Sequence, residues 1–233
     1  MRRFRSFVRR QVSYYFPNRQ SGLKAEIDFW KYWMESKALG DVQNYEYRLQ
    51  PDAPIRGFYA ELIDKIDREV IDILDVGSGP LTTIGKKYPG KQIHLTAVDP
   101  LADAYNQMLA EMSIDPPVKP LPIIGEELSS SYPSPSFDLI MAVNSLDHTE
   151  DPIQVIHEMI AVCRTGGIVG LVHHEKEGIS QNYRDLHQWN FYLSAEDLMV
   201  SGRQYRKNIN EVVRPFKFVS NVNNGFIYSW GMK

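Results

Sequence analysis

The stretch IDILDVGSGPL, residues 71–81, decides the fold that this sequence predicts. Its first half is rich in isoleucine and leucine, which is typical of a parallel strand covered on both faces of a sheet. The run passes into Gly77 and Gly79, whose missing Cβ atoms allow a sharp turn and a close approach of a ligand to the backbone. Ligands of open α/β sheets bind at the carboxyl ends of strands, so this turn is either a cofactor loop or an ordinary glycine-rich turn.

A second strand pattern, QIHLTAVDP over residues 92–100, ends in an acidic residue, Asp99. This carboxylate follows Gly77 by about 20 residues, the spacing at which an acid on the neighbouring strand accepts hydrogen bonds from ribose hydroxyls. Asp99 also suits the N-cap of a helix over residues 101–112, because Pro100 suits the first helical turn. The pattern therefore predicts a nucleoside site, and the two roles of Asp99 are compatible.

The residues around the two glycines distinguish two classes of nucleoside-binding protein. A dinucleotide-binding G-x-G-x-x-G motif needs a third glycine where Thr82 stands, so pyrophosphate binding is disfavoured. The acid before the first glycine, Asp75, resembles instead the class I S-adenosylmethionine-dependent methyltransferases, in which it lies beside the methionine end of the cofactor. The resemblance covers roughly residues 71–177 and departs from the family's E/D-x-G-x-G-x-G pattern at Leu81.

A second motif supports the same resemblance. FDLIMAV, residues 137–143, predicts a strand, and NSLDHTEDP, residues 144–152, resembles the loop that follows it in small-molecule methyltransferases of this class. Asp151 and Pro152 predict the start of the next helix. The resemblance implies an α/β fold: a Rossmann-like, seven-stranded, mostly parallel sheet with helices on both faces and a terminal antiparallel hairpin. It also implies the cofactor S-adenosylmethionine, with contacts from Asp75, Gly77, Ser78, Gly79, Asp99, Pro100, Glu126 and Asn144.

Histidines lie after the predicted fourth strand and at the end of a predicted fifth strand, residues 168–173. Methyl transfer to an alcohol removes a proton as the new bond forms, and histidine, with a pKa of about 6.5, accepts one near neutral pH. The first candidate for this base is His148, then His173 or His187, with Asp147 as an orienting acid or second base. Alternatively, each histidine only satisfies a hydrogen bond in its loop. His173, Glu177, His187 and Asp147 are competent metal ligands, but they form no compact motif, so the sequence predicts no metal site.

The acceptor is indicated by resemblance alone. The segments DVGSGPLT, AVDPLADAY, NSLDH and LHQWNF resemble a bacterial subgroup associated with polysaccharide and cell-surface glycan gene clusters. This resemblance implies O-methylation of a saccharide or another hydroxylated small molecule. N- or C-methylation of a small metabolite, and a cofactor-binding regulator without turnover, remain the alternatives.

The composition is that of an ordinary soluble protein of 233 residues with a formal net charge of −3. The negative balance argues against a nucleic-acid binder. The single cysteine, Cys163, cannot form an internal disulfide, which fits a reducing compartment. No stretch approaches the roughly 20 apolar residues of a membrane span, so the sequence predicts a cytoplasmic protein.

Residues 1–54 predict a helical extension ahead of a methyltransferase domain over residues 55–233. Residues 1–16 form a basic amphipathic pattern, which suits peripheral contact with an anionic membrane, or docking on its own domain or on the second subunit of a homodimer. A second predicted helix, residues 23–39, is rich in aromatic side chains. It therefore packs in the core or forms a wall of the acceptor pocket.

The remaining patterns predict short elements. Asn224-Gly225 is a strong hairpin signal between two final strands. The sequence predicts helices over residues 55–70, 82–88, 153–163 and 194–200, a third strand near 121–124, final strands over 213–219 and 226–230, and an irregular segment over 41–54.

Overall fold

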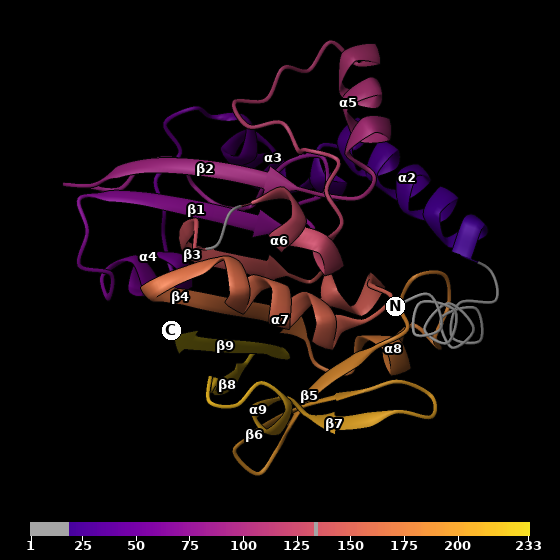
Figure 1. Ribbon diagram of the computed structural model, residues 1–233. Coiled ribbons are helices and arrows are strands. Elements are labelled where there is room, and N and C mark those ends of the chain that lie inside the picture. The colour runs from indigo at the N-terminus through magenta and orange to yellow at the C-terminus, as the bar shows by residue number, and fades with distance from the viewer. Residues whose placement is uncertain (1–18, 133–134) are drawn as a thin grey trace.

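The computed structural model describes residues 19–132 and 135–233, and its centre is a six-stranded sheet (Figure 1). The strands lie in the order β2-β1-β3-β4-β9-β8. The first four are parallel, whereas β9 is antiparallel to β4, and β8 is antiparallel to β9. The strands span Val70–Val76 (β1), Gln92–Val98 (β2), Phe137–Val143 (β3), Cys163–His174 (β4), Val219–Asn223 (β8) and Phe226–Met232 (β9).

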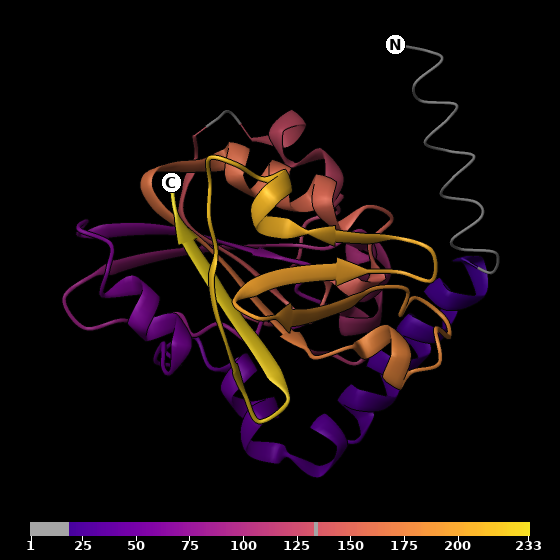
Figure 2. The same cartoon turned by 90° about the horizontal axis from the view of Figure 1, so that it is seen from below.

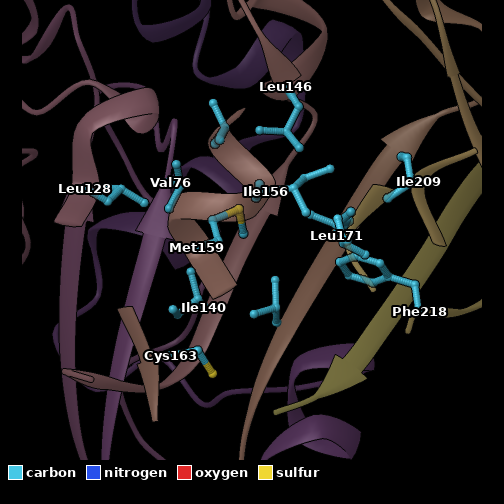
Figure 3. Packing of buried hydrophobic residues seen from close by; sticks show 14 of the residues in the cluster. Val76, Leu128, Ile140, Leu146, Ile156, Met159, Cys163, Leu171, Ile209 and Phe218 are labelled. Atoms are coloured by element: carbon cyan, nitrogen blue, oxygen red, sulfur yellow. The ribbon is translucent and has the colours of Figure 1, made fainter. Parts of the chain in front are cut away.

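Strands β1 and β3 lie at the centre of the parallel part of the sheet. Apolar layers cover both of their faces. On one face the sheet packs against helix α7, Pro152–Val162, and Figure 3 shows Ile140 and Leu171 of the sheet near Ile156 and Met159 of this helix. On the other face it packs against helix α4, Phe58–Ile63. The near-continuous apolar runs that predicted these strands reflect this burial on two sides.

A separate antiparallel sheet corrects the prediction of one seven-stranded sheet. Its strands are β5 (Asn190–Ser194), β6 (Asp197–Ser201) and β7 (Arg206–Asn208), and β5 lies beside β8 and β9 (Figure 2). The strand predicted near residues 121–124 is reduced to one bridge between Val98 and Leu121. Prolines on both sides of Leu121 explain this result, because proline lacks the N–H donor that a paired strand needs.

The segment after the glycine loop, residues 82–88, is not the helix that the sequence predicts. Its backbone pairs instead with residues 53–55: the amides of Lys86 and Lys87 donate to the Ala53 carbonyl, and the Ile55 amide donates to the Lys87 carbonyl. Gly85 makes this approach possible, since a Cβ there would lie 2.5 Å from the Pro54 carbonyl oxygen. These donors and acceptors are therefore engaged in tertiary pairing and form no helical turn.

The prediction of a helix over residues 194–200 is also wrong. This segment forms the turn and second strand of the β5–β6 hairpin. Ser194 pairs with Asp197 across the turn, where Ala195 has a φ of 55°. Leu198 and Val200 are fully buried in the main core cluster. Their burial is gained only when β6 pairs with β5, so tertiary packing overrides the local helical preference.

The hairpin at the end of the chain is confirmed. Strands β8 and β9 pair in antiparallel register, and Asn224 and Gly225 between them both have positive φ, 50° and 78°. This is the conformation that a tight two-residue hairpin turn requires. The strand predicted over residues 213–219 begins only at Val219, and a short helix, α9 (Ile209–Val212), precedes it.

Two helices build the described part of the N-terminal extension: α2, Arg19–Glu35, and α3, Val42–Leu49. The second lies where the sequence predicts irregular structure, and Asp41 caps it by accepting a hydrogen bond from the Asn44 amide at 3.1 Å. Trp33 of α2 packs with Tyr105 of helix α5, Ala102–Glu111. The extension therefore lies against the sheet domain, and α2 runs beyond the carboxyl ends of β1 and β2 (Figure 1).

The remaining helices are short. Of the helix predicted over residues 55–70, only α4 is helical.

The basic pattern over residues 1–16 lies outside the described residues, so its membrane or subunit contact stays a prediction. Among the helices of the described ranges, none is both long and apolar enough to cross a membrane. The short elements are η1 (Ala38–Gly40), η2 (Gly125–Glu127), α6 (Leu128–Ser131), η3 (Leu146–His148) and α8 (Glu177–Ser180).

Candidate cofactor and acceptor site

A cavity of about 330 Å³ lies at the carboxyl ends of β1, β2 and β3. This volume falls within the range of small-molecule sites. The loops that follow these three strands converge there, because parallel strands end at the same edge of the sheet. Seven of the eight predicted cofactor residues line the cavity: Gly77, Ser78, Gly79, Asp99, Pro100, Glu126 and Asn144.

The two glycines of the loop have a conformation and surroundings that exclude a side chain. Gly77 and Gly79 have φ values of 71° and 63°, a region that other residues rarely adopt. A Cβ on Gly77 would lie 2.4 Å from the Ser145 side chain, and one on Gly79 would lie 2.7 Å from the indole of Trp30. The loop is thus confined between two neighbouring segments, with its backbone at the cavity wall.

Asp99 both anchors the loop and lines the cavity. Its Oδ2 accepts a hydrogen bond from the Gly79 amide at 3.0 Å, and its Oδ1 accepts one from the Leu101 amide at 2.9 Å. Burial raises the pKa of this carboxyl to about 6, although the two backbone hydrogen bonds act in the opposite direction. Asp99 therefore fixes the turn before α5, but the prediction that it is the N-cap is wrong, because the N-cap is Leu101. Its role towards a ribose stays a prediction.

Asp75 is the one predicted cofactor residue that does not line the cavity. It is buried behind the glycine loop, where its Oδ2 accepts a hydrogen bond from the Thr82 hydroxyl at 2.6 Å. Thr82 occupies the position that would be glycine in a dinucleotide-binding loop. Burial raises the pKa of Asp75 to about 6 against the effect of that hydrogen bond. The carboxylate thus supports the loop from behind.

The raised pKa of Asp75 gives a pH-dependent prediction. Because the folded protein binds this proton more tightly than the unfolded chain, the ionised carboxylate costs stability above pH 6, and the cost falls as the pH drops towards 4. Asp75→Asn carries no such cost at any pH. In urea unfolding, we expect the stability difference between Asp75→Asn and the native sequence to shift by about 1 kcal/mol between pH 7 and pH 5. A constant difference would show that Asp75 titrates at an ordinary pKa.

Glu126 and Asn144 hold the loops that form the rest of the wall. The Oε1 atom of Glu126 accepts hydrogen bonds from the amides of Glu150 and Asp151, at 2.9 and 3.2 Å. Asn144 has a φ of 48°, and its Oδ1 accepts a hydrogen bond from the His174 amide at 3.1 Å. Both side chains therefore fix the backbone around the cavity that they line.

Three of the four predicted catalytic residues come together beside the cavity. The Nδ1 atom of His187 lies 2.8 Å from the Oδ2 of Asp147 and 3.0 Å from the Nε2 of His148. His148 Nε2 is 3.3 Å from the same carboxylate oxygen. His148 lines the cavity, whereas Asp147 is buried behind it. Strand β3 and the segment before β5 thus bring together residues that are 40 positions apart in the chain.

The electrostatics of this cluster favour an ionised carboxylate. Burial opposes the ionisation of Asp147, but the neighbouring histidines outweigh it, so its pKa is lowered. Burial likewise opposes protonation of His187, but the hydrogen bond and charge of Asp147 raise its pKa. A negative Asp147 beside His187 stabilises a proton on that imidazole.

His173 does not join the cluster. It is buried in β4 and stacks on Phe191, with ring centroids 4.2 Å apart. Neither of its ring nitrogens has a hydrogen-bond partner among the described residues. Burial lowers its pKa to about 4, so it is a neutral residue of the core. His173 does not line the cavity, so the prediction that it is a candidate base beside the acceptor finds no support in the cavity wall.

Glu26 of helix α2 also reaches this cavity, although no sequence motif marks it. Its Oε2 lies 3.7 Å from the Nδ1 of His148, and its Oε1 accepts a hydrogen bond from the Trp30 indole at 2.8 Å. The helix that carries both residues was predicted from its aromatic side chains, with core packing and a pocket wall as alternatives. It does both, because Trp33 is buried and Trp30 lines the cavity.

The cluster also has the composition of a metal site. Ligand atoms of Asp147, His148 and His187 lie within 4.8 Å of one another, and two imidazoles with a carboxylate suit several divalent ions. These ligands form no compact sequence motif, because Asp147 and His148 are adjacent while His187 lies in a distant loop. This arrangement is equally suited to relaying a proton.

The residues present fit the groups of S-adenosylmethionine. Asp99 suits ribose hydroxyls, and the apolar side chains of Leu101, Ile123 and Ile124 suit the faces of an adenine ring. Carboxylates at the wall suit a positively charged sulfonium.

Comparisons with known proteins agree with this fit. Residues 74–171 match the family model described as a methyltransferase domain. Ajmaline N-methyltransferase of Rauvolfia serpentina is 26% identical over 138 residues, which make up 55% of this chain and 44% of that enzyme. This chain thus spans less than half the length of that relative.

Solved structures with a similar arrangement include two S-adenosylmethionine-dependent methyltransferases. One, from Clostridium acetobutylicum, is 12% identical, with 85% of this chain and 96% of that chain covered and a TM-score of 0.45. The other, from Mesorhizobium loti, is 12% identical, with 75% and 97% covered and a TM-score of 0.46. The family match over residues 74–171 supports a methyltransferase domain, and a match to this family implies S-adenosylmethionine as the cofactor.

Proposed function

We propose that this protein transfers the methyl group of S-adenosylmethionine to a hydroxyl of a saccharide or another hydroxylated small molecule, and that His148 accepts the hydroxyl proton. The observation that carries the proposal is the cluster of Asp147, His148 and His187 at the cavity that also contains the glycine loop. A base within reach of the cofactor cavity is what an alcohol acceptor requires.

The two nitrogens of His148 have different surroundings, which assigns their roles. Nε2 faces Asp147 and His187 at 3.3 and 3.0 Å, and the proposal places the proton of the neutral ring on this nitrogen. Nδ1 faces the carboxylate of Glu26 at 3.7 Å, which is longer than a hydrogen bond. Nδ1 is therefore the lone pair available to an acceptor hydroxyl.

Proton transfer leaves a positive charge on His148, and the site is built to stabilise it. When S-adenosylmethionine is bound, it supplies a methyl group on a positively charged sulfur, which a hydroxyl oxygen attacks in line. As that oxygen loses its proton to Nδ1, the resulting imidazolium lies between Asp147 and Glu26. Holding the hydroxyl against His148 is the main contribution of the protein, since such displacements depend on near-attack geometry.

The wall contributed by helix α2 supports an acceptor with a flat, partly apolar face. Phe29 and Trp30 line the cavity, and Phe29 keeps 45% of its surface exposed. Aromatic rings of this kind suit the faces of sugar rings and other amphipathic molecules. The resemblance to glycan-cluster proteins supports the saccharide in particular.

A second candidate function is N-methylation of a small amine. The carboxylate of Glu26 at the cavity wall suits an ammonium group, and the relative from Rauvolfia serpentina is named as an N-methyltransferase. Assays with matched alcohol and amine acceptors separate the two. Methylation of amines alone would overturn the O-methyltransferase proposal.

Ligand-dependent thermal stability tests the cofactor part of the proposal. We expect saturating S-adenosylhomocysteine, at 100 times its dissociation constant, to stabilise the protein by about 2.7 kcal/mol, and NAD to have no effect. For a domain of this size, the unfolding midpoint should rise by roughly 5 to 10 °C. A shift with NAD alone would mean that the glycine loop binds a dinucleotide.

Turnover of radiolabelled S-adenosylmethionine with a panel of sugars and phenols then tests the reaction. Binding without turnover on any acceptor would favour the non-catalytic regulator.

A further inference from the structure

Helix α3 brings one basic side chain, Arg48, to the wall of the cofactor cavity. Three contacts hold it there. One guanidinium nitrogen donates to the Leu81 carbonyl at 2.9 Å, and Nε donates to the Asn44 side chain at 3.2 Å. The guanidinium also lies over the Trp33 ring, 4.8 Å from its centroid. These contacts fix the position of the group and leave its charge unneutralised.

A buried cation, Lys86, contacts the backbone of the partly buried Arg48. The ammonium of Lys86 donates to the Arg48 carbonyl at 2.8 Å, and Lys86 is 8% exposed. Across residues 19–132 and 135–233, neither Arg48 nor Lys86 forms an ion pair with a carboxylate within 4 Å. Burial lowers the pKa of both groups, that of Lys86 to about 8.

Both cations act electrostatically on the carboxylate of Asp75, whose Oδ2 already accepts a hydrogen bond from Thr82. Buried charges normally have a partner, because their desolvation is otherwise uncompensated. On the cavity side of Arg48, such a partner must come from a ligand. A guanidinium is well suited to a carboxylate, since its planar set of donors matches two oxygens.

We infer that Arg48 forms a carboxylate subsite, and that it binds the carboxylate of the methionine part of S-adenosylmethionine. The inference rests on the proposed methyltransferase function. It is supported by position: Arg48 lies at the wall formed by the glycine loop and Thr83, whereas Asp99 marks the ribose and His148 marks the acceptor. The cofactor site thus includes a residue of the N-terminal extension, outside the matched residues 74–171.

An acidic acceptor is the other source of a carboxylate at this position, and the choice of probes distinguishes the two. S-adenosylhomocysteine contains the carboxylate, whereas 5′-methylthioadenosine has the same adenosine and thioether without the amino acid part. Calorimetric titration of the full-length chain with each compound measures the contribution of that end. The variant is Arg48→Gln, and the matched control is Arg56→Gln, an exposed arginine stacked on Tyr47 from outside the cavity.

We expect Arg48→Gln to weaken S-adenosylhomocysteine about 10- to 100-fold, as the loss of a charge-assisted hydrogen bond does. Binding of 5′-methylthioadenosine should stay within about twofold, and Arg56→Gln should change neither affinity. Arg48→Lys keeps the charge but not the planar donors, so it should weaken S-adenosylhomocysteine less than the glutamine variant does. It also tests the subsite if Arg48→Gln does not fold.

Three results would overturn the inference. Equal weakening of both compounds would mean that Arg48 only shapes the cavity. Unchanged binding of S-adenosylhomocysteine would mean that the carboxylate partner belongs to the acceptor or does not exist. If the native sequence binds neither compound, the proposed function itself fails, and the subsite fails with it. This result differs from a failure of the subsite alone, because it is seen in the native protein without any variant.

Discussion

Replacing His148 by alanine should lower kcat for an alcohol acceptor by about 10²- to 10⁴-fold, the usual contribution of a general base. The reason is that the proposed mechanism uses Nδ1 of His148 at the cavity wall as the proton acceptor, with Glu26 at 3.7 Å and no direct hydrogen bond between them. Affinity for S-adenosylhomocysteine should change less than about threefold, because Asp99 and the glycine loop remain. Steady-state kinetics and calorimetry on the same preparation measure both quantities.

The matched control is His157→Ala, which removes an exposed histidine from α7, away from the cavity. It should leave kcat unchanged. A His148→Ala variant with native kcat would remove the histidine base from the mechanism and return His148 to a role in its loop. Loss of S-adenosylhomocysteine binding in the same variant would instead make His148 a cofactor contact.

Dialysis against EDTA distinguishes proton transfer from metal chemistry at the same cluster. If His148 acts as the base, the chelated protein should keep its full kcat. A loss of activity that is restored by magnesium, manganese or zinc would show that Asp147, His148 and His187 hold an ion, and the base would have to lie elsewhere.

Gly77→Ala should abolish the thermal shift with S-adenosylhomocysteine and destabilise the protein by about 2 to 4 kcal/mol. Two effects add: a positive φ costs a residue with a side chain about 1 kcal/mol, and the new methyl group would lie 2.4 Å from the Ser145 side chain. Ser145 cannot move without cost, because its hydroxyl donates to the Val76 carbonyl at 2.9 Å. Urea unfolding of the ligand-free protein measures the loss.

The chain contains a matched control for the backbone effect alone. Gly90 has a φ of 72°, close to the 71° of Gly77, but a Cβ there would meet nothing within 4 Å. Gly90→Ala should therefore cost only about 1 kcal/mol and keep the response to S-adenosylhomocysteine. Equal losses in the two variants would contradict a packed loop at Gly77.

The local sequence pattern was sufficient to predict an element wherever the residues that stabilise it lie within one short segment. Strand β3 has the predicted bounds, residues 137–143, since an apolar run buried on both faces has few alternatives. Helix α7 begins at Pro152, one residue before the predicted start, and Asp151 caps it as predicted by accepting hydrogen bonds from the amides of Ile153 and Gln154 at 3.0 and 3.1 Å. A helix cap and a hairpin turn involve residues within a few positions of one another, so the sequence displays them directly.

Local pattern failed where a distant segment supplies the stabilisation. Residues 82–88 were predicted to be helical, yet their backbone pairs with residues 53–55. Residues 197–201 form β6 because pairing with β5 buries Leu198 and Val200. A local preference of a few tenths of a kcal/mol per residue cannot compete with the burial of two apolar side chains at about 2 kcal/mol each.

The candidate site divides in the same way. By itself, the sequence determined the glycine loop, the acid at the end of β2 and the histidine after β3, because each is a short motif at a strand end whose position follows from the parallel sheet. Only the tertiary structure decided that His187 approaches His148, that His173 is buried away from them, and that Glu26 and Arg48 enter the cavity. The physical reason is that these contacts depend on how α2, α3 and the segment before β5 pack, and packing is set by burial over the whole fold, which no single window of sequence contains.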